Sequence, residues 1–192
     1  MAPARRPAGD RPPVDDDDEE QQMLVRTETT LTHAGARVAL DAALERAEEV
    51  GGAFNVAVTD AAGTLLAFAR MDGAFAASGE IARDKAWTVT AFGGLPTATL
   101  WDAISSEDAV RDGIGRRGRV AAFGGGVPVV VDGSLVGAVG VSGGSAAQDA
   151  DVAAAGASAL AARIAESSVA VPGVAVPVGV AAGHRPSREE TP

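Results

Sequence analysis

The stretch ARDKAWTVTAF, residues 82–92, holds the single lysine of the chain, Lys85. Every other Lys or Arg position is an arginine, so only Lys85 supplies a side-chain amine. A lysine amine can lose its proton when it is desolvated, whereas a guanidinium stays charged and presents a rigid fork of donors. Lys85 is therefore the first candidate for an acid, a base, a nucleophile or a compact donor. The alternative is a solvated surface lysine without a special role.

Two glycine-rich stretches could offer backbone amides to an anionic ligand. They are FGGGVP at 123–128 and GVSGGS at 140–145, and the second leads into a predicted helix. Free N–H groups at such a helix start attract carboxylate or phosphate. Both stretches flank one predicted hairpin, so they could line a pocket with Lys85, or they could merely permit tight turns. The predicted pocket residues are Phe123, Gly124, Gly125, Gly143 and Gly144.

Carboxylates close to these stretches could assist Lys85 in proton transfer. Asp149 falls in the first turn of the predicted last helix, where negative charge suits the helix dipole. Asp72 and Arg70 stand at the end of a predicted strand, where side chains are held rigidly. We therefore predict Lys85, Asp149 and Asp72 as the catalytic set, and Arg70 as a contact for an anionic ligand.

The two histidines, His33 and His184, are too far apart in the sequence to suggest a zinc site, and neither has an acidic residue at ligand spacing. Haem iron needs only one axial His or Met, which leaves His33, His184 and Met71 as candidates. The alternative for His33 is an ordinary surface position. The chain has no cysteine, which removes thiolate nucleophiles, and no GxSxG elbow stands beside a histidine.

Composition limits the possible partners. The chain has 192 residues, 46% of them hydrophobic but only 4% aromatic, so one domain with a core of small side chains is expected. Such a core favours a homo-oligomer. The net charge of −10, with GRRGR at 115–119 as the only basic cluster, argues against nucleic acid. No run of 18 apolar residues predicts a membrane span, and the default location is the cytoplasm.

The hydrophobic pattern predicts an α+β domain whose antiparallel sheet has about five strands flanked by helices. Helical spacing of apolar residues begins after Thr32 and ends at Gly51. Two strands follow, and a turn at Gly63 joins them. Three strands are expected between the basic cluster and a last helix, with Asp132-Gly133 as a hairpin turn. The predicted elements are helices at 32–51, 78–93 and 146–166, one or two short helices within 96–114, and strands at 54–60, 64–72 and within 119–142.

The chain divides into three predicted parts. Residues 1–30 contain DDDDEE and few apolar residues, which is typical of a disordered acidic leader. Residues 31–166 form the domain. Residues 167–192 are interrupted by Pro and Gly too often for a central strand, so they are predicted to be a flexible tail or an edge-clinging segment.

Three stretches occur together in one order: VAVTDAAGTLLAFARMDGA, ARDKAWTVTAF and FGGGVPVVVDGSLVGAVGVSGGSAAQD. In this combination the chain resembles the GlcG/HbpS family, which includes the C-terminal domain of PduO-type proteins and relatives of cucumopine synthase. The resemblance covers about residues 31–165. It implies a profilin-like domain that assembles into dimers or rings up to octamers, with haem-binding or haem-degrading members and others that act on small carboxylated metabolites.

Three functional hypotheses remain open. The first is an oligomer that binds haem or a related tetrapyrrole, with His33 as the axial metal ligand and Arg70 or the glycine amides at the propionates. The second is an enzyme of the lyase, isomerase or cyclase type that acts on a small carbonyl or carboxylate metabolite, with Lys85 as acid or base. The third is a non-catalytic structural subunit whose glycines serve only packing.

Overall fold

A computed structural model describes residue 24 and residues 27–167. Nearly all of the predicted leader, 1–30, and of the predicted tail, 167–192, lies outside the described residues, and His184 lies outside them too. The described part extends from the segment before the first long helix to the end of the last one.

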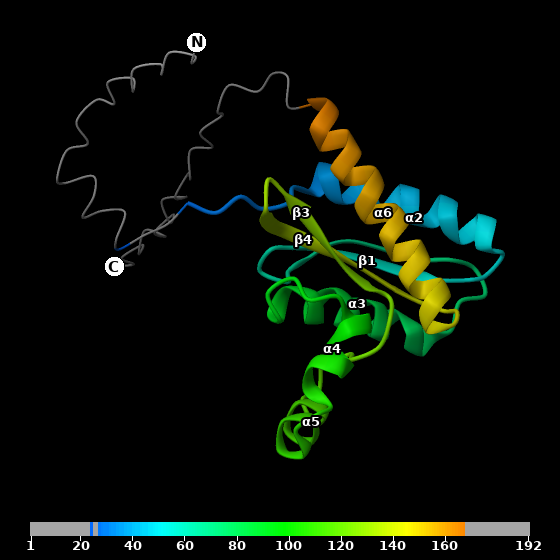
Figure 1. The fold of residues 1–192 in the computed structure, drawn as a ribbon. Coiled ribbons are helices and arrows are strands. Elements are labelled where there is room, and N and C mark those ends of the chain that lie inside the picture. The colour runs from blue at the N-terminus through cyan, green and yellow to red at the C-terminus, as the bar shows by residue number, and fades with distance from the viewer. Residues whose placement is uncertain (1–23, 25–26, 168–192) are drawn as a thin grey trace, which may run out of the picture.

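The chain forms a four-stranded antiparallel sheet between two layers of helices, as predicted for an α+β domain. The strand order is β2-β1-β4-β3. Figure 1 shows α2 and α6 on one face of this sheet and α3 on the other. The elements are α2 (His33–Val50), β1 (Asn55–Asp60), β2 (Leu65–Arg70), α3 (Ala76–Ala91), α4 (Thr97–Ile104), α5 (Asp108–Gly115), β3 (Gly126–Val131), β4 (Ser134–Ser142) and α6 (Ala146–Ser167).

The ends of α2 and α6 confirm the signals in the sequence. Thr32 caps α2 by accepting a hydrogen bond from the Gly35 N–H at 3.2 Å, and Gly51 ends the helix with a φ of 77°. Before α6, the Ser145 N–H donates to Gln148 Oε1 at 3.0 Å and the Gln148 N–H donates to Ser145 Oγ at 3.3 Å. This reciprocal pair is a capping box, which the spacing of Ser145 and Gln148 in the sequence also predicts, and it fixes the direction in which α6 leaves the sheet.

Both predicted hairpins are confirmed by positive backbone angles at the expected turns. Gly63 has a φ of 81°, and Asp132 and Gly133 have φ values of 49° and 77°. Two successive positive φ angles are what a two-residue turn between twisted strands requires. The turns set the register in which β1 pairs with β2 and β3 with β4.

The sheet has four strands where about five were predicted, because the segment after the basic cluster does not join it. There the Ala121 N–H donates to Thr88 Oγ1 at 3.0 Å, and the Thr88 hydroxyl donates to the Arg119 carbonyl at 3.1 Å. A side chain of α3 thus satisfies backbone groups that a strand would have paired. The segment consequently runs as an irregular connection over α3.

The two faces of the sheet are packed differently. The face under α2 and α6 buries valines, leucines and alanines, whereas the face under α3 buries mostly alanine. At Gly140 in β4, a Cβ would clash with the Ala82 carbonyl and the Ala86 amide, so the glycine lets the α3 backbone lie directly on the strand. Within the part of the chain described, no helix combines the length and apolar character needed to cross a bilayer.

Candidate functional site

Lys85 lies in the middle of α3 on the side that faces the sheet. Its neighbours Ala82, Ala86 and Val89 belong to the apolar stripe of that helix and are buried. Helical spacing therefore turns the lysine inward with them, and its side chain is 0% exposed. Because α3 sits so close to β4, the amine reaches the end of the sheet, where α6 begins.

The Lys85 amine is enclosed by partners from three parts of the chain. Its Nζ donates to Asp149 Oδ2 at 2.7 Å and to the Val141 carbonyl at 2.9 Å. The Phe123 ring covers it, with Nζ 4.6 Å from the ring centroid, which is within the range of a cation–π interaction. We call Lys85, Asp149, Val141, Phe123 and Gly125 the Lys85 cluster.

Asp149 occupies the first turn of α6 and is 3% exposed. Its Oδ2 binds the lysine, and its Oδ1 accepts a hydrogen bond from the Gly144 N–H at 2.9 Å. The capping box holds the turn in which this carboxylate sits, and the helix dipole favours its charge. Both oxygens of Asp149 are thus engaged inside the protein.

The first glycine bend, at Gly124 and Gly125, makes the space in which the ion pair fits. A Cβ on Gly125, whose φ is 122°, would lie 2.6 Å from Lys85 Nζ, 2.5 Å from the Val141 carbonyl oxygen and 2.8 Å from Asp149 Cβ. A Cβ on Gly124 would lie 2.6 Å from the Ala146 carbonyl oxygen. The space admits a compact ammonium but not a planar guanidinium, which gives a physical reason for lysine at position 85.

Burial is the main influence on the titration of Lys85. It lowers the pKa of the amine below the ordinary lysine value, and the hydrogen bond and charge of Asp149 oppose part of that shift. Since the amine has no exposed surface, a ligand would reach it only after the Phe123 ring, itself 47% exposed, had moved aside. In the described conformation the pair is closed.

Among the predicted site residues, Lys85, Asp149, Phe123 and the glycines of both bends come together. Arg70 and Asp72 do not bind the ion pair. Arg70 Nε and Nη2 donate to the Ala74 carbonyl at 3.1 and 2.7 Å, which fixes the chain as it leaves β2. Asp72 is exposed beside this bend. Arg70 is the last residue of β2 and Asp72 follows it, so both stand at the end of this strand, but β2 is an edge strand separated from β4 by β1, and neither residue reaches Lys85.

His33 lies at the other end of the helical layer. It is the exposed first residue of α2, which runs antiparallel to α6. A Cβ on Gly35 would contact Leu160 near the end of α6, whereas Arg46 near the end of α2 binds Asp151 at 2.7 Å near the start of α6. The rise of a helix therefore places His33 about 20 Å from Asp149. Within one chain, His33 and the glycine bends form two separate regions.

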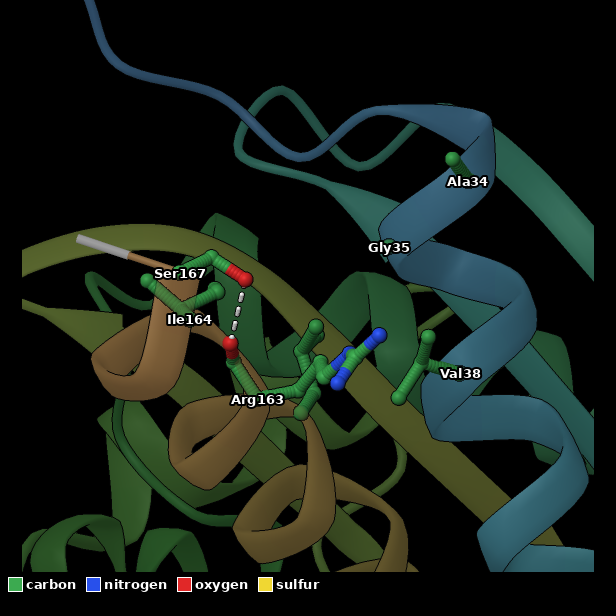
Figure 2. Close-up of a pocket in the computed structure, with 7 residues that line it drawn as sticks. Ala34, Gly35, Val38, Arg163, Ile164 and Ser167 are labelled. Carbon is green, nitrogen blue, oxygen red and sulfur yellow. Dashed lines mark hydrogen bonds between the residues drawn. The ribbon is translucent and has the colours of Figure 1, made fainter. Parts of the chain in front are cut away.

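A groove lies beside His33, between the first turns of α2 and the last turns of α6. Its volume is about 490 Å³ and its lining is mainly apolar. Figure 2 shows the Arg163 side chain reaching from α6 toward Val38 on α2. Arg163 also pairs with Glu166 at 3.4 Å, and both side chains are well exposed. The residues that line this α2–α6 groove are Ala34, Gly35, Val38, Leu160, Arg163, Ile164 and Ser167.

The α2–α6 groove continues into a second pocket of about 240 Å³ at the end of the β3–β4 hairpin. Gly35, Leu160 and Ile164 line both, and Val131 and Val136 of the hairpin line only the second. Together they form one apolar depression. Within residues 27–167, no group of three or more His, Asp or Glu side chains is placed to hold a metal ion.

Arg163 and the groove are not predicted from the sequence. Arg163 is an ordinary exposed arginine on a helix, and its neighbours Leu160 and Ile164 carry the 3.6-residue spacing of any amphipathic helix. The one available signal is the small residues Gly35, Ala39 and Gly156, which let α2 and α6 approach closely. These small residues indicate that two helices pack closely, but they do not indicate the groove between the first turns of α2 and the last turns of α6.

Comparison with known proteins gives consistent matches over the described domain. The family described as haem-degrading, HbpS-like proteins matches residues 31–158. The corrinoid adenosyltransferase PduO of Salmonella typhimurium is 40% identical over 115 residues, which are 58% of this chain and 33% of PduO. Protein GlcG of Escherichia coli K12 is 36% identical over 123 residues, 62% of this chain and 85% of GlcG. This chain thus spans a third of PduO but most of GlcG.

Among solved structures, a complex of PduOC with haem is similar in fold to this chain. Its TM-score is 0.62 and its sequence identity is 34%. The similarity covers 68% of this chain and 95% of the PduOC chain.

Proposed function

This chain belongs to the family of haem-degrading, HbpS-like proteins, and from this membership we propose that it binds haem or a related tetrapyrrole as a homo-oligomer. The observation that carries the proposal is the related structure that was solved with haem. Haem, when bound, would supply an iron centre whose axial position a single histidine can fill.

The α2–α6 groove is the part of the described chain that best fits such a ligand. Its volume of about 490 Å³ lies within the usual range of small-molecule pockets. Val38, Leu160 and Ile164 offer apolar contacts to a macrocycle, and Arg163 offers a cation to a propionate. His33 does not line the groove, but it is the exposed residue directly before Ala34 at its rim, and in this proposal it would hold the iron. In this proposal Arg163, and not Arg70 as predicted from the sequence, contacts the propionate.

Lys85 and Asp149 are assigned to holding the fold together at the glycine bends. Each polar atom of the pair already has partners inside the protein, and the amine is not exposed. A buried ion pair with satisfied hydrogen bonds specifies one arrangement of the elements that carry it. In this proposal the cluster positions α3 against α6 and contacts no ligand.

Assembly of several copies is supported by apolar side chains that the single chain leaves exposed. Phe75 is 71% exposed and Trp101 is 49% exposed, and α5 has no buried residue. Figure 1 shows α4 and α5 projecting away from the sheet. Large exposed aromatic residues and a projecting helix are features that contacts between copies would cover.

Haemin titration tests the proposal. The full chain is expected to give a Soret band with saturating stoichiometry, and His33→Ala is expected to weaken haemin binding about tenfold or more, which is about 1.4 kcal/mol. His184→Ala is the matched control, because it removes the other histidine and alters none of the residues that line the groove. Absence of a Soret shift with the native chain would overturn haem binding, and equal effects of the two variants would overturn the assignment to His33.

A further inference from the structure

The helix α5 and the two arginines that follow it carry free positive charge, and we call residues 108–117 the α5 arm. Arg111 forms ion pairs with both aspartates of α5, at 2.8 and 3.0 Å, so the acidic side chains of the helix already have a cation. Arg116 and Arg117 are exposed and have no ion-pair partner in the described part of the chain. Two guanidinium groups at the end of the arm are therefore available to carboxylates from outside.

The α5 arm also has an apolar side. Val110 is 37% exposed, and Ile114, one turn later on the same side of the helix, is partly exposed. Figure 1 shows α5 projecting beyond α3, away from the sheet, and none of its residues is buried. The arm thus presents its two free guanidinium groups next to apolar side chains that gain free energy if another surface covers them.

A pocket of complementary character lies between the last turns of α2 and the chain that leaves β2. Its volume is about 460 Å³, and Leu44 and Met71 give it apolar surface. Glu48 and Asp72 add two exposed carboxylates, which have no ion-pair partner within residues 27–167. Arg70 also lines the pocket, but two nitrogens of its guanidinium donate to a backbone carbonyl of the same bend. The residues that line this β2-end pocket are Leu44, Glu48, Ala69, Arg70, Met71 and Asp72.

The arm and the pocket cannot meet within one chain. Figure 1 shows α2 on one face of the sheet, and α3, α4 and α5 on the other. The sheet and α3 therefore stand between the α5 arm and the β2-end pocket, which α2 helps to form. We propose that the α5 arm of one copy binds the β2-end pocket of a second copy, with the two free arginines facing the two free carboxylates. This contact rests on the assembly of several copies proposed above.

The contact joins two different surfaces, so it repeats in one direction from copy to copy. Each copy offers its arm to one neighbour and its pocket to another, and such a series closes into a ring when the rotation between copies allows it. Exposed ion pairs are individually weak and act mainly on the choice of partner, whereas the covered apolar side chains favour association. Opposite charges on the two surfaces therefore select the register in which the apolar parts meet.

Charge reversal on the two sides tests the contact. The arm variant, Arg116→Glu with Arg117→Glu, and the pocket variant, Glu48→Arg with Asp72→Arg, each place like charges across it. Each variant alone is expected to associate through this contact at least about tenfold more weakly in analytical ultracentrifugation of the full chain. All four side chains are exposed, so the fold does not depend on them.

Mixing the two variants separates this contact from a general effect of charge. In an equimolar mixture every arm can meet a pocket of opposite charge on the other variant, so the native assembly is expected to return. Arg37→Glu is the control, because it reverses an exposed arginine of α2 that does not line the pocket, and it is expected to leave the assembly unchanged.

The outcomes distinguish this contact from the proposed function. An assembly that persists in either charge-reversed variant, or that the mixture fails to restore, would overturn the contact alone. A native chain that stays monomeric would overturn the contact together with the proposed assembly. The haemin titration decides ligand binding in each case, since neither the arm nor the β2-end pocket shares a residue with the α2–α6 groove.

Discussion

The Lys85 cluster and the α2–α6 groove differ in almost every physical respect. The cluster is closed: an ammonium, a carboxylate and backbone groups bind one another beneath the Phe123 ring, with the lysine 0% exposed. The groove is open and apolar, with one arginine reaching across it (Figure 2). In the Lys85 cluster the polar groups bind one another and hold α3 against α6. In the α2–α6 groove the apolar side chains leave a surface that a ligand can contact.

This contrast shows that chemical reactivity and accessibility are separate properties. A titratable amine beside a carboxylate is typical of catalytic sites, yet here each group is satisfied by the fold. Aliphatic side chains between two helices suggest only packing, yet they leave a volume of about 490 Å³. Variants of the cluster should therefore affect stability, and variants of the groove should affect binding.

The largest effect is expected from Asp149→Ala. It leaves the Lys85 ammonium buried without its carboxylate and removes the acceptor of the Gly144 N–H, so the free energy of unfolding should fall by about 3–5 kcal/mol. Urea unfolding measures this loss. The double variant Lys85→Met with Asp149→Leu is the control, because it removes both charges and should recover most of the stability. A loss below about 1 kcal/mol in the single variant would show that the pair is not structural.

The glycine bend should be the next most sensitive point. Gly125→Ala introduces a Cβ against three groups of the Lys85 cluster, and its φ of 122° is unfavourable for any other residue. Gly133→Ala is the matched control, since its φ of 77° carries the backbone cost of about 1–2 kcal/mol but no atom lies within 4 Å. The first variant should cost clearly more in thermal unfolding. Equal costs would contradict the crowding inferred at position 125.

In the groove, Arg163→Ala should weaken haemin binding about threefold to tenfold, or about 0.7–1.4 kcal/mol, because a propionate loses its cation. Stability should hardly change, since Arg163 is exposed and its pair with Glu166 is weak. Arg37→Ala removes a comparable exposed arginine of α2 that pairs with Asp41 and does not line the groove. Equal haemin affinities for the two variants would separate Arg163 from the ligand.

The smallest effect concerns pH. Burial holds the pKa of Lys85 below its ordinary value of 10.5, so the unfolded chain binds this proton more tightly than the folded chain does. The free energy of unfolding should therefore rise with pH between the lowered pKa and 10.5. The groups facing the amine are Asp149, the Val141 carbonyl and Phe123. Denaturant titrations at a series of pH values that approach 10.5 from below should show this slope in the native chain but not in the double variant.

Local signals predicted most of the fold. Thr32, Gly51 and the Ser145–Gln148 pair act within one helical turn, and Gly63 and Gly133 act within one hairpin, so their effects can be read from neighbouring residues. The fifth strand predicted after the basic cluster is absent from the sheet because of an interaction with a residue far away in the sequence. Thr88, more than 30 positions earlier in the chain, binds the backbone of that segment, and no local pattern announces such a partner.

The candidate site was predictable only where residue type was unusual. A single lysine and two glycine stretches pointed to the Lys85 cluster, and the structure brings them together. Its closure depends on how α3 and α6 meet around the end of the sheet, which the sequence does not reveal. The placement of His33 far from the cluster follows from the antiparallel pairing of α2 and α6, which is also long-range.

The enclosure of Lys85 makes the native chain resistant to amine-directed reagents at this position. Acylation of its side chain requires the Phe123 ring to move aside or α3 and α6 to separate, so the rate of that labelling reports how often the fold opens there. Because no other lysine exists, a mass increase on the peptide that contains residues 82–92 has one origin. The rate at which Lys85 is acylated therefore measures local opening of the fold around α3.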